Sequence, residues 1–193
     1  MNGLDRLLQQ WRLRHAARFI PDSARVLDVG CFDDSLFRHL GRRLGLGLGL
    51  DPLLARPVDG ERFQLRRGSF PHMRAEDGPF EVITMLAVLE HVPAEDLTRW
   101  AQTCSDLLVP GGLVVATIPA PAVDTILEVL IRLRVLHGMS VEEHHGFEPD
   151  MAPRVFSRAG FTVLQRKRFQ LGLNNLFVFA KPAGVRLPVH GIA

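Results

Sequence analysis

Two aspartates and a glycine turn supply the residue types and spacing that could bind a nucleotide-like cofactor. The stretch VLDVGCFDDS runs from a β-branched, leucine-rich segment that contains Asp28 into Gly30, which permits a turn that a side chain would block. A helix N-terminus beyond such a turn offers free backbone N–H groups to a polar ligand. Asp51 follows Gly30 by 21 residues and ends a second strand-like segment. An acidic residue there accepts hydrogen bonds from ribose hydroxyls, although a solvated turn aspartate is the alternative.

The elements that must position these residues alternate between strand-like and helix-like patterns, which is typical of a parallel sheet covered by helices. We predict a helix from about Ser35, capped by Asp34 or Ser35, with apolar residues at 36, 37, 40 and 44. Further strands are predicted at 46–50, 63–67, 80–85, 113–118, 161–169 and 176–181, and further helices at about 95–108 and 150–159. The short turn between the last two strands permits only antiparallel pairing.

A second glycine pattern lies in the strand at 46–50, where Gly45, Gly47 and Gly49 spell GxGxG. Helix-like residues precede this pattern, and Asp51-Pro52 follows it in place of a helix N-cap. We therefore interpret it as a small-residue strand packed closely against a helix, and not as a phosphate loop.

Two further helices flank this predicted sheet. The N-terminal residues predict a packed amphipathic helix, whose apolar face would consist of Leu4, Leu7, Leu8, Trp11 and Phe19. A transit peptide is the alternative, but Asp5 is acidic and the serines typical of such peptides are missing. The helix over 125–137, in an insertion at about 120–148, is apolar nearly all round, so a lid, a homodimer contact and a buried helix all stay open. We expect one domain over 1–182 and a frayed tail over 183–193.

The composition disfavours several classes of protein. The 193 residues are 47% hydrophobic and 23% charged, which is ordinary for one globular domain. The 23 basic and 21 acidic side chains balance too evenly to indicate a nucleic-acid partner. Cys31 and Cys104 are too few for a disulfide framework and lack zinc spacing, so we expect no metal and a reducing, cytoplasmic location. No apolar run reaches the roughly 18 residues that a membrane span needs.

Six elements in this order resemble the class I S-adenosylmethionine-dependent methyltransferases: VLDVGC, GLDP, GSFP, FEVITM with LEHVP behind it, LLVPGG, and the terminal hairpin after AGF. The likeness covers about residues 20 to 182 and is nearest to small bacterial methyltransferase-domain proteins. It implies an α/β fold, a Rossmann-like three-layer sandwich. The sheet would be mostly parallel and seven-stranded, in the order 3-2-1-4-5-7-6 with strand 7 antiparallel. The implied cofactor is S-adenosyl-L-methionine.

The resemblance also implies a role for each matching residue. The cofactor-binding residues would be Asp28, Gly30 and Cys31 around the methionine moiety, Asp51 at the ribose hydroxyls, Pro52 beside the adenine, Ser69 and Phe70 at the adenine amine and ring, and Met85 and Leu86 bordering the methionine. Phe32 and Asp34 stand where this family usually has glycines. If the turn keeps the family's path, Phe32 must turn its ring into the helix–sheet interface and leave its backbone N–H groups to the ligand.

Methyl transfer is an in-line displacement at a carbon activated by the sulfonium, so the enzyme mainly aligns the acceptor and excludes water. A base is needed only if the acceptor loses a proton, and the candidates are His91, His144 and His145, because histidine titrates near neutrality. The N-methylating groups that carry an NPPY-like or DPPY-like motif are disfavoured, since neither follows the strand at 80–85. An oxygen or carbon on a small molecule or on a lipid or glycan precursor is the expected acceptor.

Two other functions stay open. A methyltransferase-like domain that has lost catalysis and serves as a binding or scaffold module would explain Phe32 and Asp34. An NAD-dependent oxidoreductase would need glycines at 30, 32 and 35, and Phe32 and Ser35 occupy the last two positions. The closing antiparallel hairpin also argues against the oxidoreductase.

Overall fold

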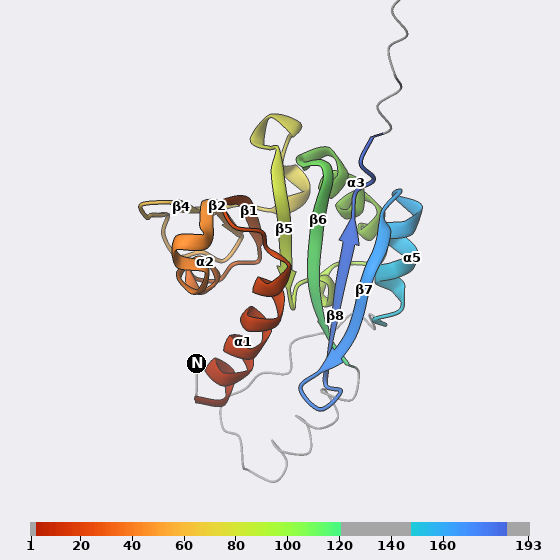
Figure 1. Cartoon of the computed structure of the whole chain (residues 1–193), viewed down its shortest axis with the longest axis horizontal. Coiled ribbons are helices and arrows are strands. Elements are labelled where there is room, and N and C mark those ends of the chain that lie inside the picture. Colours follow the sequence, from red (N-terminus) through yellow and green to blue (C-terminus); the bar gives the residue numbers. More distant parts are fainter. Residues whose placement is uncertain (1–2, 121–147, 185–193) are drawn as a thin grey trace, which may run out of the picture.

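The computed structural model describes residues 3–120 and 148–184. The predicted helix over 125–137, most of the insertion that contains it, His144, His145 and the tail beyond residue 184 lie outside the described residues. Figure 1 shows the arrangement of the rest as a sheet between two layers of helices. The strands are β1 (Ala24–Val29), β2 (Leu44–Asp51), β3 (Val58–Asp59), β4 (Phe63–Arg67), β5 (Phe80–Leu86), β6 (Leu108–Pro119), β7 (Thr162–Phe169) and β8 (Asn174–Ala180). The α-helices are α1 (Gly3–Ala16), α2 (Ser35–Leu40), α3 (Leu97–Leu107) and α5 (Met151–Arg158).

The strand order of the sheet is β3-β4-β2-β1-β5-β6-β8-β7. The strands from β4 to β6 are parallel to one another, whereas β8 runs antiparallel to both of its neighbours. Without β3 this is the predicted order 3-2-1-4-5-7-6 with an antiparallel seventh strand, which is therefore confirmed. The eighth strand is a correction: β3 is only two residues long and pairs antiparallel with β4. Two residues are too few to produce a period-two hydrophobic pattern.

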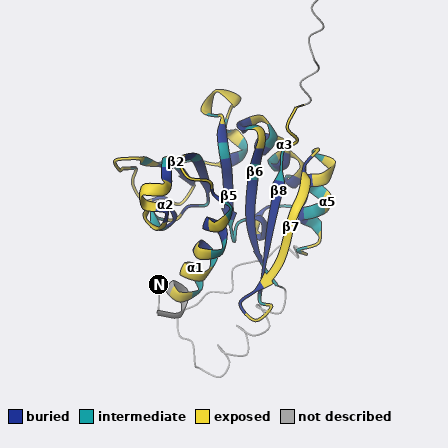
Figure 2. Ribbon diagram, viewed as in Figure 1, coloured by how far each residue is buried: buried dark blue, intermediate teal, exposed yellow. Residues whose placement is uncertain are grey.

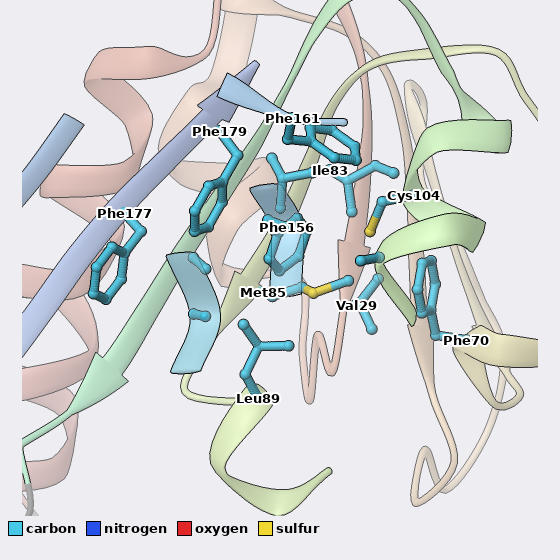
Figure 3. Close-up of a cluster of buried hydrophobic side chains, with 14 of the residues drawn as sticks. Val29, Phe70, Ile83, Met85, Leu89, Cys104, Phe156, Phe161, Phe177 and Phe179 are labelled. Carbon is cyan, nitrogen blue, oxygen red and sulfur yellow. The ribbon is translucent and has the colours of Figure 1, made fainter. Parts of the chain in front are cut away.

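Alternate residues of the strands point to opposite faces, and each face has its own core. Val26 belongs to the cluster that holds Leu13 of α1 and Phe37 of α2, while its neighbour Leu27 belongs to the cluster with α3 and α5. Figure 3 shows the second cluster, in which Phe156 of α5 stacks on Phe179 with ring centroids 4.3 Å apart. Because both faces of the central strands are covered, their sequences are almost continuously apolar.

The glycines of β2 lie where neighbouring side chains come too close for a Cβ atom. A Cβ at Gly47 would stand 2.7 Å from the Phe37 ring of α2, and one at Gly49 would stand 2.5 Å from Leu65 Cδ2. The interpretation of this pattern as a small-residue strand against a helix is confirmed.

The N-terminal helix α1 packs against the domain, as predicted, but through a different face. Leu13 and Ala16 are buried, whereas Leu7 is 61% exposed and Trp11 is 41% exposed. Placing Leu7 and Trp11 on the packed face was therefore wrong. Residues 13 and 16 lie on the opposite side of the helix from residues 7 and 11, so contact through one pair turns the other toward solvent.

Two element boundaries also differ from the prediction. Helix α2 ends at Leu40, and Leu44 is the first residue of β2 and not a residue of the helix. Strand β6 begins at Leu108, directly after α3, so Pro110-Gly111-Gly112 lies inside the strand. The pairing of β5 with β6 shifts register across this stretch, between Phe80 and Val82. The proline and glycines thus form an irregular start to a strand and not a separate linker.

Candidate functional site

The carboxyl ends of three parallel strands meet at one edge of the sheet. Val29 of β1 pairs with Leu50 of β2 on one side and with Met85 of β5 on the other. The turns after these strands, at Gly30, Asp51 and Ala87, therefore lie side by side. In open sheets of this kind, ligands bind in the crevice outside the carboxyl ends of the strands.

Gly30 makes the turn after β1 for two reasons. Its φ is +68°, a left-handed conformation that favours glycine. A Cβ atom at this position would stand 2.6 Å from Val88 Cγ2, in the turn after β5. The Gly30 N–H donates a 2.8 Å hydrogen bond to the Leu50 carbonyl of β2. Gly30 therefore bonds to the end of β2 and allows the turn after β5 to approach the turn after β1 closely.

Two backbone hydrogen bonds hold the carboxylate of Asp51, the last residue of β2, in place. Its side chain is only 8% exposed. Oδ2 accepts a hydrogen bond of 3.0 Å from the Phe32 N–H, and Oδ1 accepts one of 2.7 Å from the Leu53 N–H. Asp51 is therefore not a solvated turn residue. Each carboxylate oxygen keeps a further lone pair that could accept a hydrogen bond from a ligand hydroxyl.

Phe32 takes the backbone conformation of the glycine it replaces. Its φ is +54°, and its side chain is 64% exposed. The expectation that the ring packs into the helix–sheet interface was wrong. The reason is that the left-handed backbone, with its N–H fixed to Asp51, leaves the side chain on the solvent side of the turn. The cost is the left-handed conformation of a non-glycine residue, about 1–2 kcal/mol.

The start of helix α2 is stabilised by a different aspartate from the one predicted. Asp33 Oδ1 accepts a 2.9 Å hydrogen bond from the Ser35 N–H. Asp34 occupies the N-cap position but makes no capping hydrogen bond, and instead forms a 2.7 Å ion pair with Arg38. Asp33, Asp34 and Ser35 can each accept a capping hydrogen bond, so the sequence pattern alone could not show which of them does so.

Asp28 lies inside β1 and is the most deeply buried carboxylate of the turn, at 4% exposure. Its pKa is raised to about 7: burial is the largest cause, a hydrogen bond from Thr84 acts in the opposite direction, and the charges of Asp33 and Asp51 add to the rise. The Thr84 hydroxyl donates this bond to Oδ1 over 2.6 Å. The Asp28 carboxyl can therefore hold or release a proton near neutral pH.

Thr84 is a site residue that sequence reasoning missed. Its Cα is the direct partner of the Asp28 Cα in the pairing of β1 with β5, and its side chain is fully buried. The available signal was a hydroxyl residue within the apolar run VITML of this strand. A buried polar side chain in such a strand requires a partner, and Asp28 is that partner.

The other predicted cofactor residues divide into exposed and buried ones. Pro52 and Ser69 are exposed next to the ends of β2 and β4. Phe70 is 2% exposed, with its ring centroid 5.1 Å from that of Trp100, and Met85 is fully buried (Figure 3). Leu86 is partly buried against the opposite core. Cys31 is 7% exposed, and burial raises the pKa of its thiol to about 12, so its backbone is what it offers to a ligand.

His91 and Glu90 end the short helical turn Leu89–His91 that follows β5. His91 is exposed, and Glu90 is 3% exposed. Sequence reasoning singled out the histidine and missed the buried carboxylate beside it. An acidic residue between Leu89 and Val92, both of them core residues, was the signal that could have indicated it.

Solved structures that resemble this chain share its fold. A methyltransferase from a Haloferax volcanii complex with a methyltransferase activator matches with a TM-score of 0.71 and 15% identity, covering 94% of this chain and 95% of that one. The magnesium protoporphyrin IX methyltransferase of Synechocystis PCC 6803, solved with bound SAH, matches with a TM-score of 0.67 and 16% identity, covering 94% of this chain and 88% of that one. These likenesses show that the chain has a Rossmann-like α/β fold.

The family model described as "Methyltransferase domain" matches residues 2–166, so the chain belongs to this family of S-adenosylmethionine-dependent methyltransferases. A ubiquinone biosynthesis O-methyltransferase of Xanthomonas axonopodis is 36% identical over 107 residues, which are 50% of this chain and 44% of the relative. One of Acinetobacter baumannii is 27% identical over 153 residues, 72% of this chain and 64% of the relative. The matched segments span 44% of the Xanthomonas relative and 64% of the Acinetobacter one, so the chain covers less than two thirds of either relative.

Proposed function

We propose that this protein transfers the methyl group of S-adenosylmethionine to an oxygen of a hydroxylated small molecule or lipid precursor. The observation that carries the proposal is the arrangement of the turn at Gly30 and the Asp51 carboxylate, side by side at the carboxyl edge of the sheet. The methyltransferase-domain family supports the reaction class. Relatives named O-methyltransferases support oxygen over carbon as the acceptor atom.

The residues at this edge fit the cofactor. Asp51 has lone pairs left for the ribose hydroxyls after its two backbone hydrogen bonds. Phe32 follows the left-handed path of a glycine, so its side chain does not force the turn into another shape. The pKa of Asp28 is raised to about 7, so this carboxyl can ionise near neutral pH. Its anion would be compatible with the positively charged sulfonium. When bound, S-adenosylmethionine supplies an electrophilic methyl group.

The chain's own contribution would be to orient the acceptor hydroxyl and to receive its proton. His91 is exposed at the turn after β5, next to the proposed cofactor crevice, and could accept a proton from a phenol-like hydroxyl. His144 and His145 remain candidates from the sequence for the same role. An acidic hydroxyl, such as that of a dihydroxylated aromatic ring, requires the weakest base and is the acceptor we would test first.

A non-catalytic binding module is the second candidate, and the exposed ring of Phe32 at the glycine turn favours it. Titration calorimetry with S-adenosylmethionine and S-adenosylhomocysteine tests the cofactor site. Incubation with catechol-like acceptors, followed by mass spectrometry for an added methyl group, tests the reaction. Binding with product would establish the enzyme. Absence of binding in the folded protein would refute methyl transfer and indicate the non-catalytic module, and binding with no product from catechol-like acceptors would refute the proposed acceptor class.

The matched variants are Asp51→Ala at the proposed ribose site and Asp59→Ala on the surface, where Asp59 forms an ion pair with Arg66. Both remove one acidic side chain. Only the first should weaken the binding of S-adenosylhomocysteine, whereas equal losses in the two variants would indicate a general effect of charge.

A further inference from the structure

Three large apolar side chains are exposed to solvent near the β7–β8 turn. Leu7 and Trp11, one helical turn apart on α1, are 61% and 41% exposed, and Leu171 at the hairpin tip is 97% exposed. The Gln170 side chain donates a 3.0 Å hydrogen bond to the Leu8 carbonyl, so the hairpin tip lies against the same part of α1. Leu171 also has a φ of +56°, a left-handed backbone conformation that leucine rarely adopts.

The same region carries exposed cations. Arg14 on α1 and Arg18 in the short helical turn Ala17–Phe19 follow Trp11, and Lys167 and Arg168 precede the hairpin tip on β7; all four are exposed. Figure 2 shows β7 as an exposed strand. The charges of Arg18 and Lys167 both lower the pKa of His15, after its burial, so these two cations lie close to one histidine. His15 in turn stacks on Phe169, with ring centroids 4.5 Å apart.

The local charge departs from the balance of the whole chain. The sequence has no aspartate or glutamate from Arg6 to Phe19 or from Gly160 to Leu173, although the chain as a whole has a net charge of only +2. We call the set Leu7, Trp11, Leu171, Arg14, Arg18 and Lys167 the basic apolar surface. Its apolar side chains lie toward the start of α1 and at the hairpin tip, and its cations lie behind them, with Arg18 and Lys167 both close to His15.

This surface adjoins the edge of the sheet that holds the candidate site. The Ala120 N–H, just past the carboxyl end of β6, donates a 2.9 Å hydrogen bond to the Leu173 carbonyl in the β7–β8 turn. Strands β5 and β6 both point toward this end of the molecule (Figure 1). A body touching the hairpin tip and α1 would therefore lie on the side to which the crevice opens.

We propose that the basic apolar surface docks this protein onto a lipid bilayer that contains anionic lipids. Tryptophan and leucine side chains insert at the level of the headgroups, and arginine and lysine bind the anionic phosphates. A second copy of the chain fits less well, because like charges would face each other across the contact. A nucleic acid would use the cations but not three exposed apolar side chains. Within the described residues no helix is long and apolar enough to cross a membrane, so docking would be at the surface.

The test is co-sedimentation of the full chain with vesicles of phosphatidylcholine alone or with one quarter phosphatidylglycerol. We expect binding to the anionic vesicles that weakens as salt is raised. Arg14→Glu with Arg18→Glu should reduce the partition coefficient at least tenfold, and Trp11→Ser with Leu171→Ser should do the same. The matched controls are Arg42→Glu and Leu46→Ser, which alter an exposed arginine and a 57% exposed leucine elsewhere on the surface.

Binding by the parent and the controls, with loss in both double variants, would support the proposal. Failure of the folded parent to bind anionic vesicles would overturn it, and so would equal binding to both vesicle types. Binding to an RNA or DNA oligonucleotide that competes with the vesicles, and that survives the change of Trp11 and Leu171, would assign the surface to nucleic acid instead. Vesicle binding requires neither cofactor nor acceptor, so the proposed methyl transfer can fail independently of this test.

Discussion

Asp28 and Asp51 are the same residue type on neighbouring strands, with nearly equal exposures of 4% and 8%, yet their surroundings differ. Asp28 lies inside β1 and has one hydrogen bond, from a neutral hydroxyl. Asp51 lies at the end of β2, where each of its oxygens accepts a backbone N–H. Burial raises the pKa of Asp28 to about 7. At nearly equal exposure, the two carboxyl groups therefore differ in the donors that the fold provides, two backbone N–H groups for Asp51 and a side-chain hydroxyl for Asp28.

The different hydrogen bonds of Asp28 and Asp51 suit them to different roles at the same edge of the sheet. Asp51 orders the turns on either side of it, because its oxygens hold the N–H groups of Phe32 and Leu53. Asp28 contributes a carboxyl group that is costly to ionise in the absence of a cation. In the proposed enzyme, the first would position the cofactor, and the second would be stabilised as an anion by the positive charge that the cofactor brings.

The largest expected effect is on stability as a function of pH. Because the folded-state pKa of Asp28 is raised from 3.8 to about 7, the folded state binds more protons than the unfolded state between these values. The free energy of unfolding should therefore fall as pH rises from 4 to 8, by roughly 4 kcal/mol at most from this group. Asp28→Asn should remove this decline. Urea unfolding of both proteins at several pH values measures it.

Asp59→Asn is the control for that experiment, since Asp59 is an exposed partner of Arg66. It should leave the pH profile of the parent unchanged. Parallel profiles for the parent and Asp28→Asn would show that Asp28 ionises normally in the folded protein, and would contradict the raised pKa of this carboxyl.

The sequence was sufficient to predict the sheet order, because six motifs in succession resemble a family for which this order is typical. It was also sufficient to place Gly30 in the turn after one strand and Asp51 at the end of the next, while their role in cofactor binding stays a prediction. It could not give the partner of Asp28, because Thr84 is 56 residues away and the pairing depends on the register of β1 against β5.

Surface orientation was less predictable than topology. The apolar residues of α1 cover more than one side of the helix, so periodicity could not decide which of them face the sheet. The ring of Phe32 presented the same difficulty. Its direction follows from a left-handed φ and from the hydrogen bond of its N–H to Asp51, and neither is visible in the residue type.

The second prediction concerns the organising role of Asp51. Asp51→Ala leaves the N–H groups of Phe32 and Leu53 without their acceptors, and removes the proposed acceptor of the ribose hydroxyls. We expect the affinity for S-adenosylhomocysteine to fall by about 1.5–3 kcal/mol, which is roughly 10-fold to 150-fold in dissociation constant. Titration calorimetry measures this. Asp51→Asn keeps one oxygen acceptor and should lose less, and an unchanged dissociation constant in the folded alanine variant would remove Asp51 from the site.

The smallest expected effect is at Phe32, where the turn held by Asp51 has a side chain in place of a glycine. The exposed ring gives up little packing, and glycine removes the cost of the left-handed φ while making the unfolded chain more flexible. Phe32→Gly should therefore change the free energy of unfolding by less than about 1 kcal/mol. Phe32→Ala keeps the left-handed strain without the ring and should be less stable than the glycine variant by about 1 kcal/mol.

Phe32→Gly and Phe32→Ala together test whether Asp51 holds the backbone of the turn independently of the Phe32 ring. Since the Phe32 N–H remains in both variants, its hydrogen bond to Asp51 should remain as well. The dissociation constant for S-adenosylhomocysteine should then stay within about threefold of the parent, which is less than 1 kcal/mol. Urea unfolding and calorimetry on the same preparations measure both quantities. A loss of 3 kcal/mol or more in stability would mean that the ring packs in solution, and a large gain in affinity would mean that it blocks the crevice.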